Sequence, residues 1–181
     1  MILVAGAPAS GKTTLARRLA ADLALPLLAR DTIKEALFDS LGAPDRERSR
    51  ELGVASYAVL YALLTSLLAA GPGLVLESNF HHGLAEEALR PIVAAARAAL
   101  VYCEAARAET IRRYVARFER GERHPGHHDA AALPEIAANL DAGVYAPLAL
   151  AIPTLRVDTT HGYAPDLPAI TAFIAAATTE A

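Results

Sequence analysis

The chain has 181 residues, of which 54% are hydrophobic and 20% are charged, and its formal net charge is −3 at pH 7. This length suits one domain over residues 1–181, and the composition supports a sizeable core, which excludes a mostly disordered chain. No long block of basic residues suggests a nucleic-acid tail, and a single cysteine excludes an internal disulfide and a cysteine zinc site.

Short apolar strands alternate with helices along the chain. Strands are expected at residues 2–5, 26–29, 74–77, 99–103 and 154–157. Helices are expected at residues 11–23, 32–41, 46–70, 83–97, 107–119, 134–140 and 165–177, with a stop at the Gly-Pro-Gly of residues 71–73. This alternation predicts an α/β fold, a parallel sheet in a three-layer αβα sandwich whose ligands bind where the strands end.

The first strand follows Met1 without a basic segment, so no signal peptide is expected. The apolar run of residues 57–70 is expected to be too short to cross a bilayer. We therefore expect a cytoplasmic protein with no membrane partner, either a monomer or a homodimer.

Residues 6–13 fit the phosphate-loop pattern G-x-x-x-x-G-K-[ST] between a strand and a helix. Lys12 is expected to bridge the β- and γ-phosphates of a nucleotide, and the Thr13 hydroxyl to bind Mg²⁺. The residues expected to hold the nucleotide at this loop are Gly6, Ala7, Pro8, Ala9, Ser10, Gly11, Lys12, Thr13 and Thr14.

Two acidic residues follow strands on the same edge of the predicted sheet. Asp31 comes after the second strand, where it could accept a proton from an incoming hydroxyl or cap the next helix. Glu77 closes the third strand and could hold Mg²⁺ through water, although the two carboxylates could exchange these roles. Asn79 and His82 come next and could line the pocket, or serve as a turn residue and a solvated position at a helix start.

Arg113, Arg117 and Arg120 recur on one face of an expected helix, and Arg123 follows it. A solvated basic face is the alternative, but after the fourth strand of such a domain we favour an arginine lid over about residues 107–130. The histidines of residues 124–128 are expected to form a lid turn that touches phosphate or substrate, in preference to a metal site.

Asp158 and Thr159 follow the fifth strand near the expected nucleobase, where an aspartate turn is the alternative. The acceptor pocket is expected to include part of the alanine-rich helix of residues 46–70, which core packing explains equally well. The residues expected to contact a phosphoryl acceptor are Asp31, Lys34, Tyr57, Glu77, Asn79, His82, Arg120 and His127.

Together these segments resemble the small P-loop kinases grouped as AAA-type ATP-binding "domain 33" proteins, relatives of chloramphenicol phosphotransferase, polynucleotide kinase and zeta toxins. The resemblance rests on residues 6–13, 30–31, 77–80, 113–127 and 157–159. It implies a five-stranded parallel sheet in 2-3-1-4-5 order, ATP and Mg²⁺ as cofactors, Asp31 as general base, and Arg117 and Arg123 as lid arginines. Glu77 departs from the aspartate usual at its position.

Three functions are consistent with these features. The first is transfer of the γ-phosphoryl group of ATP to a hydroxyl of a small molecule such as a metabolite, sugar or antibiotic. The second uses a 5′-hydroxyl nucleic-acid end as acceptor, which the absence of tryptophan and the 6% aromatic content make less favourable. The third is an ATP-binding switch without kinase turnover.

Overall fold

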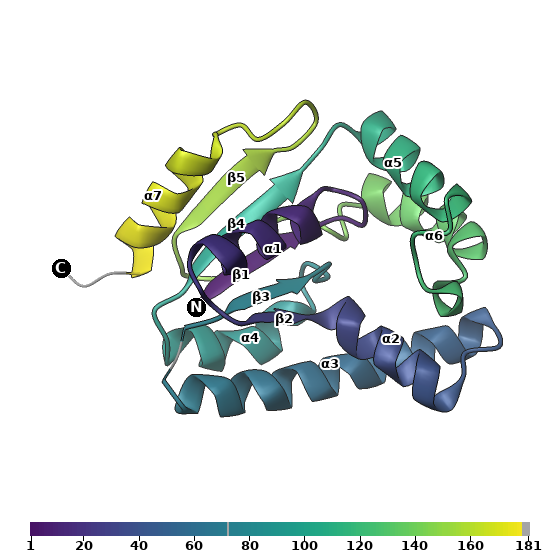
Figure 1. Ribbon diagram of the computed structural model, residues 1–181, viewed down its shortest axis with the longest axis horizontal. Helices are drawn as coiled ribbons and strands as arrows, with labels where there is room; N and C mark the ends of the chain where they lie inside the picture. Colours follow the sequence, from purple (N-terminus) through teal and green to yellow (C-terminus); the bar gives the residue numbers. More distant parts are fainter. Residues whose placement is uncertain (72, 179–181) are drawn as a thin grey trace.

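Five parallel strands form the centre of the molecule in the order β2-β3-β1-β4-β5, which confirms the expected strand order (Figure 1). The computed structural model describes residues 1–71 and 73–178. The strands are β1 (Ile2–Gly6), β2 (Leu27–Ala29), β3 (Val75–Ser78), β4 (Ala99–Glu104) and β5 (Thr154–Asp158). In the central register Val4 lies opposite both Glu77 and Val101, so the ends of β1, β3 and β4 lie side by side.

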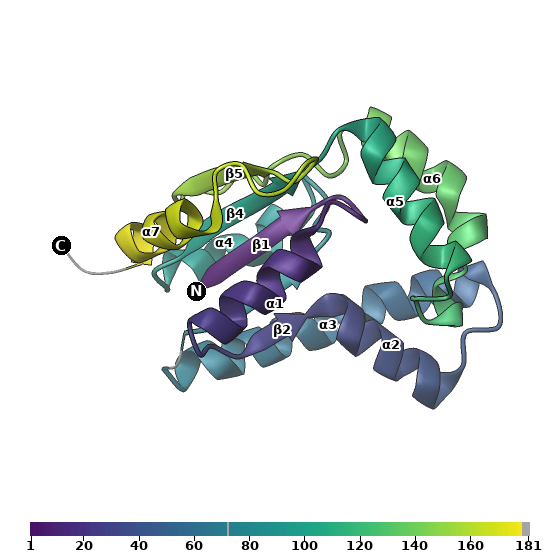
Figure 2. The same ribbon diagram turned by 45° about the horizontal axis from the view of Figure 1, so that its top comes forward.

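Helices cover both faces of the sheet (Figure 2). One face is covered by α1 (Lys12–Asp22) and α7 (Leu167–Thr178), and the other by α3 (Arg46–Ala69) and α4 (Ala85–Ala94). Successive residues of β1 serve opposite layers: Ile2 and Val4 pack with α1 and α7, whereas Leu3 packs with α3 and α4. Because both of their faces are buried, the central strands β1 and β4 are almost continuous apolar runs. The expected three-layer sandwich is confirmed.

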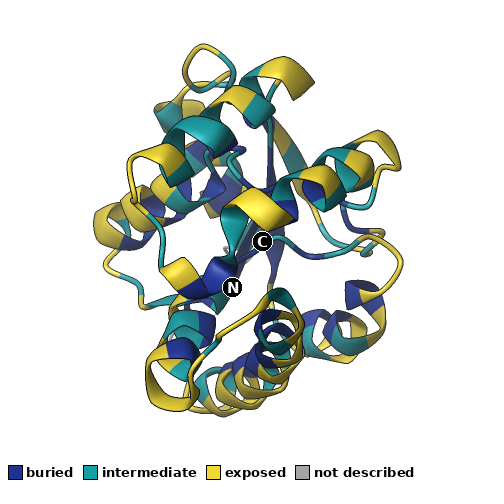
Figure 3. Ribbon diagram, turned by 90° about the vertical axis from the view of Figure 1, so that its right-hand side faces the viewer, coloured by how far each residue is buried: buried dark blue, intermediate teal, exposed yellow. Residues whose placement is uncertain are grey.

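The remaining helices lie beyond the carboxyl ends of the strands (Figures 1 and 2). They are α2 (Arg30–Leu41), which packs on α3, and the pair α5 (Arg107–Glu119) and α6 (Asp129–Asp141), joined through a short 3-10 turn, η1 (Pro125–His127). Tyr114, Ala132 and Ile136 form a small core between α5 and α6. Seen along the strands, buried residues occupy the centre and the outward helix faces are exposed (Figure 3).

Two helices begin earlier than the sequence indicates. We expected a helix from Pro134, but α6 starts at Asp129, because the alanine-rich turn before the proline is itself helical and Pro134 lies inside the helix. Similarly α2 starts at Arg30, directly after β2, so that Asp31 lies within its first turn.

The long helix α3 ends at Ala69, before the expected stop, whose Pro72 lies outside the described residues. By length and composition alone this helix could cross a membrane, a test that helices in the cores of globular proteins also pass. The apolar run of residues 57–70 is thus only part of a longer helix. Its Leu60 and Leu64 are completely buried against the sheet, and Ser49 and Ser56 are buried as well.

Candidate active site

The loop between β1 and α1 has a backbone that requires glycine at both ends. Gly6 has a φ of 146°, and a Cβ built there would lie 2.2 Å from the carbonyl oxygen of Cys103. Gly11 has a φ of 84°, which favours glycine. The carbonyl of Ser10 accepts a hydrogen bond from Thr159 Oγ1 at 2.7 Å, which ties the loop to the end of β5. Residues 6–11 therefore form a preformed, tightly wound loop.

The loop ends directly at the N-terminus of α1. The backbone N–H groups of Lys12, Thr13 and Thr14 belong to the first helical turn, where no intrahelical carbonyl accepts them, and the helix dipole favours an anion there. Above them lies a cavity of about 320 Å³, the phosphate-loop cleft. It is lined by Ala9, Gly11, Lys12, Thr13, Thr14, Arg112, Arg113, Ala116, Arg117 and Arg120.

Glu77 lies beneath this cleft, in contact with Lys12 and Thr13. It is 3% exposed, its Oε1 is 3.5 Å from Lys12 Nζ, and it accepts a hydrogen bond from Thr13 Oγ1 at 3.3 Å. A hydroxyl and a carboxylate oxygen side by side at a phosphate site are the oxygen ligands that Mg²⁺ prefers. Thr13 and Glu77 are therefore the residues that could hold the metal.

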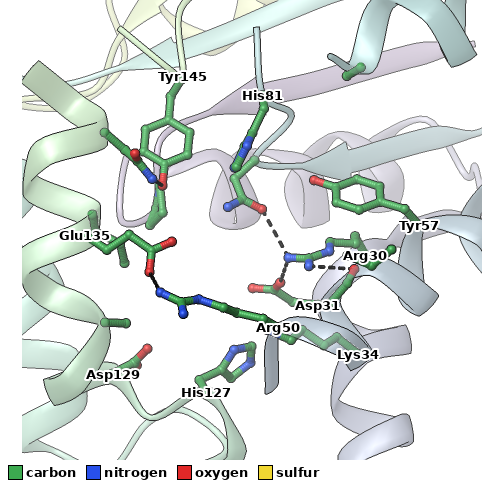
Figure 4. A pocket seen from close by; sticks show the side chains of 18 of the residues that line it. Arg30, Asp31, Lys34, Arg50, Tyr57, His81, His127, Asp129, Glu135 and Tyr145 are labelled. Carbon is green, nitrogen blue, oxygen red and sulfur yellow. Dashed lines mark hydrogen bonds and ion pairs between the residues drawn. The ribbon is translucent and has the colours of Figure 1, made fainter. Parts of the chain in front are cut away.

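A second, larger cavity of about 480 Å³, here called the central cavity, separates α2 and α3 from α5 and α6. Its wall includes five residues expected to contact an acceptor: Asp31, Lys34, Tyr57, Asn79 and His127. Figure 4 shows Arg30 beside Asp31 and Tyr57, and Arg50 of α3 reaching Glu135 of α6. Lys12 and Arg117 line both this cavity and the phosphate-loop cleft, so the two spaces meet at these residues.

Asp31 is held by cations and not by the end of its helix. Its carboxylate lies 3.0 Å from Arg123 Nη2 and 3.5 Å from Arg30 Nη1, and no side-chain cap is formed at the start of α2. Desolvation would raise the pKa of Asp31, but the charges of Arg123, then of Lys12 and Arg30, lower it well below the usual range. The carboxylate is therefore ionised at neutral pH, with 40% of the side chain accessible through the cavity.

His127 and Asp129 orient Arg123. Arg123 donates to Asp129 Oδ1 at 2.9 Å and lies 3.0 Å from His127 Nδ1, while His127 Nε2 is 2.9 Å from Glu35 Oε1. Burial and then the charge of Arg123 lower the pKa of His127, which keeps its ring neutral. A neutral ring that accepts from Arg123 at Nδ1 and donates to Glu35 at Nε2 satisfies both contacts.

The arginines of α5 have different environments. Arg117 Nε is buried without a hydrogen-bond partner in the described part of the chain, and its guanidinium lies between the two cavities. Arg113 donates to Glu109 and, at 2.7 and 2.9 Å, to the carbonyls of Thr159 and Thr160. Arg113 thus fixes the segment after β5, whereas Arg117 is free to meet an anion.

Some expected residues lie elsewhere. The ring of His82 contacts the carbonyl of Pro147 at 2.7 Å and lies outside both cavities, closer to the solvated helix-start alternative. Arg120 is paired with Glu122 at the rim of the phosphate-loop cleft and does not line the central cavity. Asp158 accepts the backbone N–H of Thr160 at 2.7 Å, which is the aspartate turn that was the alternative to a nucleobase contact.

The histidines of residues 124–128 contact α2 and the loop that follows it. His124 Nε2 lies 3.1 Å from Asp39 Oδ1, and His128 Nε2 lies 2.8 Å from the Ala43 carbonyl. No group of three or more His, Cys, Asp or Glu side chains within residues 1–71 and 73–178 is arranged to hold a metal ion.

The sequence analysis missed several residues of the central cavity. They are Arg30, Arg46, Arg50, Glu135, Asn139 and Tyr145. The spacing of Arg46 and Arg50, one helical turn apart at the start of the long helix, was a signal for a basic wall. For Glu135 no local signal existed, because it lies 89 positions from Arg46, with which it pairs.

The chain is similar to known proteins in sequence and in fold. A family model described as an AAA domain (AAA_33) matches residues 1–142. A candidate kinase from Chloroflexus aurantiacus J-10-fl is 36% identical with a TM-score of 0.85, and 98% of this chain and 97% of that one are covered. Two more distant structures share the fold. One is a sugar kinase from Janibacter sp. HTCC2649, with 14% identity, a TM-score of 0.62, and 99% of this chain and 98% of that chain covered. The other is a gluconokinase from Sinorhizobium meliloti 1021, with 16% identity, a TM-score of 0.60, and 97% of this chain and 90% of that chain covered.

No curated protein matches the chain in sequence. The family match spans the phosphate loop, Asp31 and the arginines of α5, and the likeness to the Chloroflexus protein runs through nearly the whole length. The resemblance seen in the sequence is thereby confirmed: the chain belongs to the AAA_33 family of small P-loop kinases.

Proposed function

We propose that the protein transfers the γ-phosphoryl group of ATP to a hydroxyl of a small molecule. One observation carries this proposal: the phosphate-loop cleft and the central cavity meet at Lys12 and Arg117. A donor phosphate and an acceptor hydroxyl bound on the two sides would approach each other at these cations, which is where phosphoryl transfer needs positive charge.

On the donor side, the first-turn amides of α1 and Lys12 would hold the β- and γ-phosphates. Thr13 and Glu77 would hold Mg²⁺, which when bound neutralises charge on the phosphate oxygens. Arg117, whose Nε lacks a partner among the described residues, would donate to the equatorial oxygens of the transferred group. Arg113 supports the segment of Asp158 and Thr159, beside which we place the adenine.

On the acceptor side, the ionised Asp31 would take the proton of the hydroxyl as its oxygen bonds to the γ-phosphorus. The bond between that phosphorus and the β,γ-bridging oxygen breaks, and ADP leaves. Asp31 suits this role better than Glu77, since it lines the central cavity while Glu77 lies beneath Lys12 and Thr13. Arg123 and its partners hold the carboxylate in position.

The central cavity fits a compact acceptor better than a polymer. Its volume of about 480 Å³ is that of a typical metabolite site. The tyrosines that could stack on nucleobases already make ring contacts within the cavity wall: Tyr57 stacks on Tyr61 with ring centroids 6.0 Å apart, and the Arg30 guanidinium lies 4.6 Å from the Tyr57 ring centroid.

Binding of a fluorescent ATP analogue with Mg²⁺, followed by a phosphorylation screen of hydroxylated metabolites, sugars, antibiotics and a 5′-hydroxyl oligonucleotide, tests the proposal. Lys12→Ala should lose nucleotide binding. Asp31→Asn should keep it and lower kcat by about 10²–10⁴-fold on whichever acceptor is found. Asp141→Asn, a surface carboxylate paired with Arg107, is the matched control and should behave as wild type.

Nucleotide affinity unaltered in Lys12→Ala would refute the donor site, and unaltered turnover in Asp31→Asn would refute the base. If only the oligonucleotide were phosphorylated, the acceptor would be a nucleic-acid end instead of a small molecule. ATP hydrolysis without any phosphorylated acceptor would favour a switch protein.

A further inference from the structure

The central cavity carries more positive than negative charge. Its cations are Lys12, Arg30, Lys34, Arg46, Arg50, Arg117 and Arg123, and its carboxylates are Asp31, Asp129 and Glu135. The carboxylates are already shared: Asp31 pairs with both Arg30 and Arg123, Asp129 pairs with Arg123, and Glu135 pairs with both Arg46 and Arg50, which leaves Lys34 without a carboxylate partner. Lys12 and Arg117 belong to the donor side. The excess positive charge of the central cavity therefore lies with the cations of α2 and α3.

Lys34 is the least compensated of these cations. The residue is 5% exposed, and within residues 1–71 and 73–178 its Nζ has no hydrogen bond and no ion pair. Its Nζ lies over the Phe38 ring, 5.1 Å from the ring centroid. Burial, followed by the charge of Arg30, lowers the pKa of Lys34 to about 8. A buried ammonium without a partner is costly, so a site of this kind is completed by an anion.

Arg30 and Arg46 flank Lys34. One turn separates Arg30 from Lys34 on α2, and the Nε of Arg46 is buried without a partner in the described part of the chain. Gly53 of α3 provides the space: a Cβ there would lie 2.9 Å from Arg30 Nη2 and 3.4 Å from Lys34 Nζ. The glycine lets both cations lie against the backbone of α3.

We propose that Lys34, Arg30 and Arg46 form an anion subsite that binds a carboxylate or phosphate group of the phosphoryl acceptor. Asp31 and Lys34 are three residues apart on α2 and therefore share a face, which directs the base and the subsite into the same cavity. This inference rests on the proposed function and narrows it. The acceptor is a small hydroxylated compound that also carries one anionic group.

Such a subsite would discriminate between acceptors. An anionic acceptor would pair with Lys34 and bring its hydroxyl toward Asp31. A neutral acceptor of the same size would leave the buried ammonium unpaired, and a site built for a polar partner rejects ligands that lack it.

The subsite can be tested without turnover, because Lys12 and Lys34 are the only lysines of the chain. Carbon-13 labelling of lysine gives one NMR signal for the donor site and one for the subsite, assigned with Lys34→Arg. A non-hydrolysable ATP analogue with Mg²⁺ should move the Lys12 signal. Sulfate, as a probe for a phosphate group, or acetate, as a probe for a carboxylate, added afterwards should move the Lys34 signal and raise the pKa of Lys34 above about 8.

The two signals separate the two hypotheses. A Lys34 signal that neither sulfate nor acetate moves would overturn the subsite, even where the analogue moves Lys12. A Lys12 signal that the analogue leaves in place would count against the proposed function and not against the subsite. Preference for sulfate or for acetate tells a phosphate-bearing acceptor from a carboxylate-bearing one.

Matched acceptor pairs give the functional test. Each pair consists of an anionic compound and its neutral counterpart, such as a sugar acid and the sugar, a hydroxy acid and its amide, or a sugar phosphate and the sugar. Wild type should phosphorylate the anionic member preferentially. Lys34→Met keeps the length of the side chain and should raise KM for that member by about ten- to a hundredfold, the effect of a lost hydrogen bond to a charged group.

Lys34→Arg should recover part of the loss, because it restores the charge. A residue needed only for folding would instead lower kcat for both members of a pair. Preferential phosphorylation of neutral members by wild type, with KM unchanged in Lys34→Met, would overturn the proposal.

Discussion

Replacing Lys34 with methionine should stabilise the free protein at neutral pH. In the folded chain the residue is 5% exposed and its ammonium has no ion-pair partner among the described residues, whereas in the unfolded chain the ammonium is hydrated. Methionine fills a similar volume without a charge, so folding of the variant does not include the free-energy cost of desolvating an ammonium group.

The magnitude follows from the pKa of Lys34, which burial and the Arg30 charge lower from 10.5 to about 8. At about 1.36 kcal/mol per pH unit, this difference corresponds to ~3 kcal/mol of the free energy of unfolding near neutral pH. Between pH 8 and 10.5 the unfolded lysine binds a proton that the folded one has released, so wild-type stability rises with pH in that window. Below pH 8 both forms are protonated and the cost is constant.

Urea denaturation of both proteins near pH 7 and near pH 10 measures the effect. Between these pH values the free energy of unfolding of wild type should rise by about 2.5 kcal/mol more than that of Lys34→Met, and thermal denaturation should show the same difference as roughly 5–10 °C in Tm. Because both proteins contain the same other titrating groups, the contribution of these groups cancels when the change in unfolding free energy of one protein is subtracted from that of the other. Lys34→Arg keeps its charge at both pH values and should lack the gain. If wild type and Lys34→Met showed the same change in unfolding free energy between these pH values, Lys34 would not be an uncompensated cation.

Further predictions concern the loop, the lid and its support. Gly6→Ala should lower the free energy of unfolding by about 2 kcal/mol or more and weaken nucleotide binding, seen by denaturation and ATP-analogue titration, because its Cβ would overlap the Cys103 carbonyl. Arg117→Met should preserve nucleotide affinity and lower kcat by about 10²–10³-fold in a steady-state assay. Tyr114→Phe removes the 2.7 Å hydrogen bond to Asp129 and should cost about 1–2 kcal/mol in urea unfolding; unchanged values in any of these assays would refute the corresponding role.

The features that could be predicted from the sequence are those that depend on residues close together in the chain. Gly6 and Gly11 are needed for backbone reasons, so the phosphate loop can be recognised from its spacing alone. Apolar runs buried on both faces identify central strands, and the resemblance supplied their order. Asp31 could be placed near the site because a residue that follows a parallel strand lies at the ligand-binding edge. Its interaction with Arg123, 92 positions away, could not be predicted.

The parts that the sequence did not predict depend on contacts between distant elements. His82 turns toward the Pro147 carbonyl, a partner that only the packing of the segment before β5 supplies. The basic wall of the central cavity exists because α3 approaches α2 at Gly53 and α6 offers Glu135 to two arginines. Charge balance in such a cavity is a property of the assembled elements, and so it becomes visible only in the structure.

Helix α2 connects these observations. Among its residues only Lys34 and Phe38 are buried: Lys34 lines the central cavity and Phe38 packs on the turn of residues 124–128, and neither belongs to the clusters that pack on the sheet. Phe38 lies between the rings of His124 and His127, at 5.2 and 5.1 Å between centroids. The same face carries Asp31 and Lys34, so the helix that bears the proposed base and anion subsite is also the one on which the turn of residues 124–128 rests. A substitution of Phe38 that alters its contact with the turn of residues 124–128 should therefore affect both the base Asp31 and the subsite residue Lys34, because all three lie on the same helix.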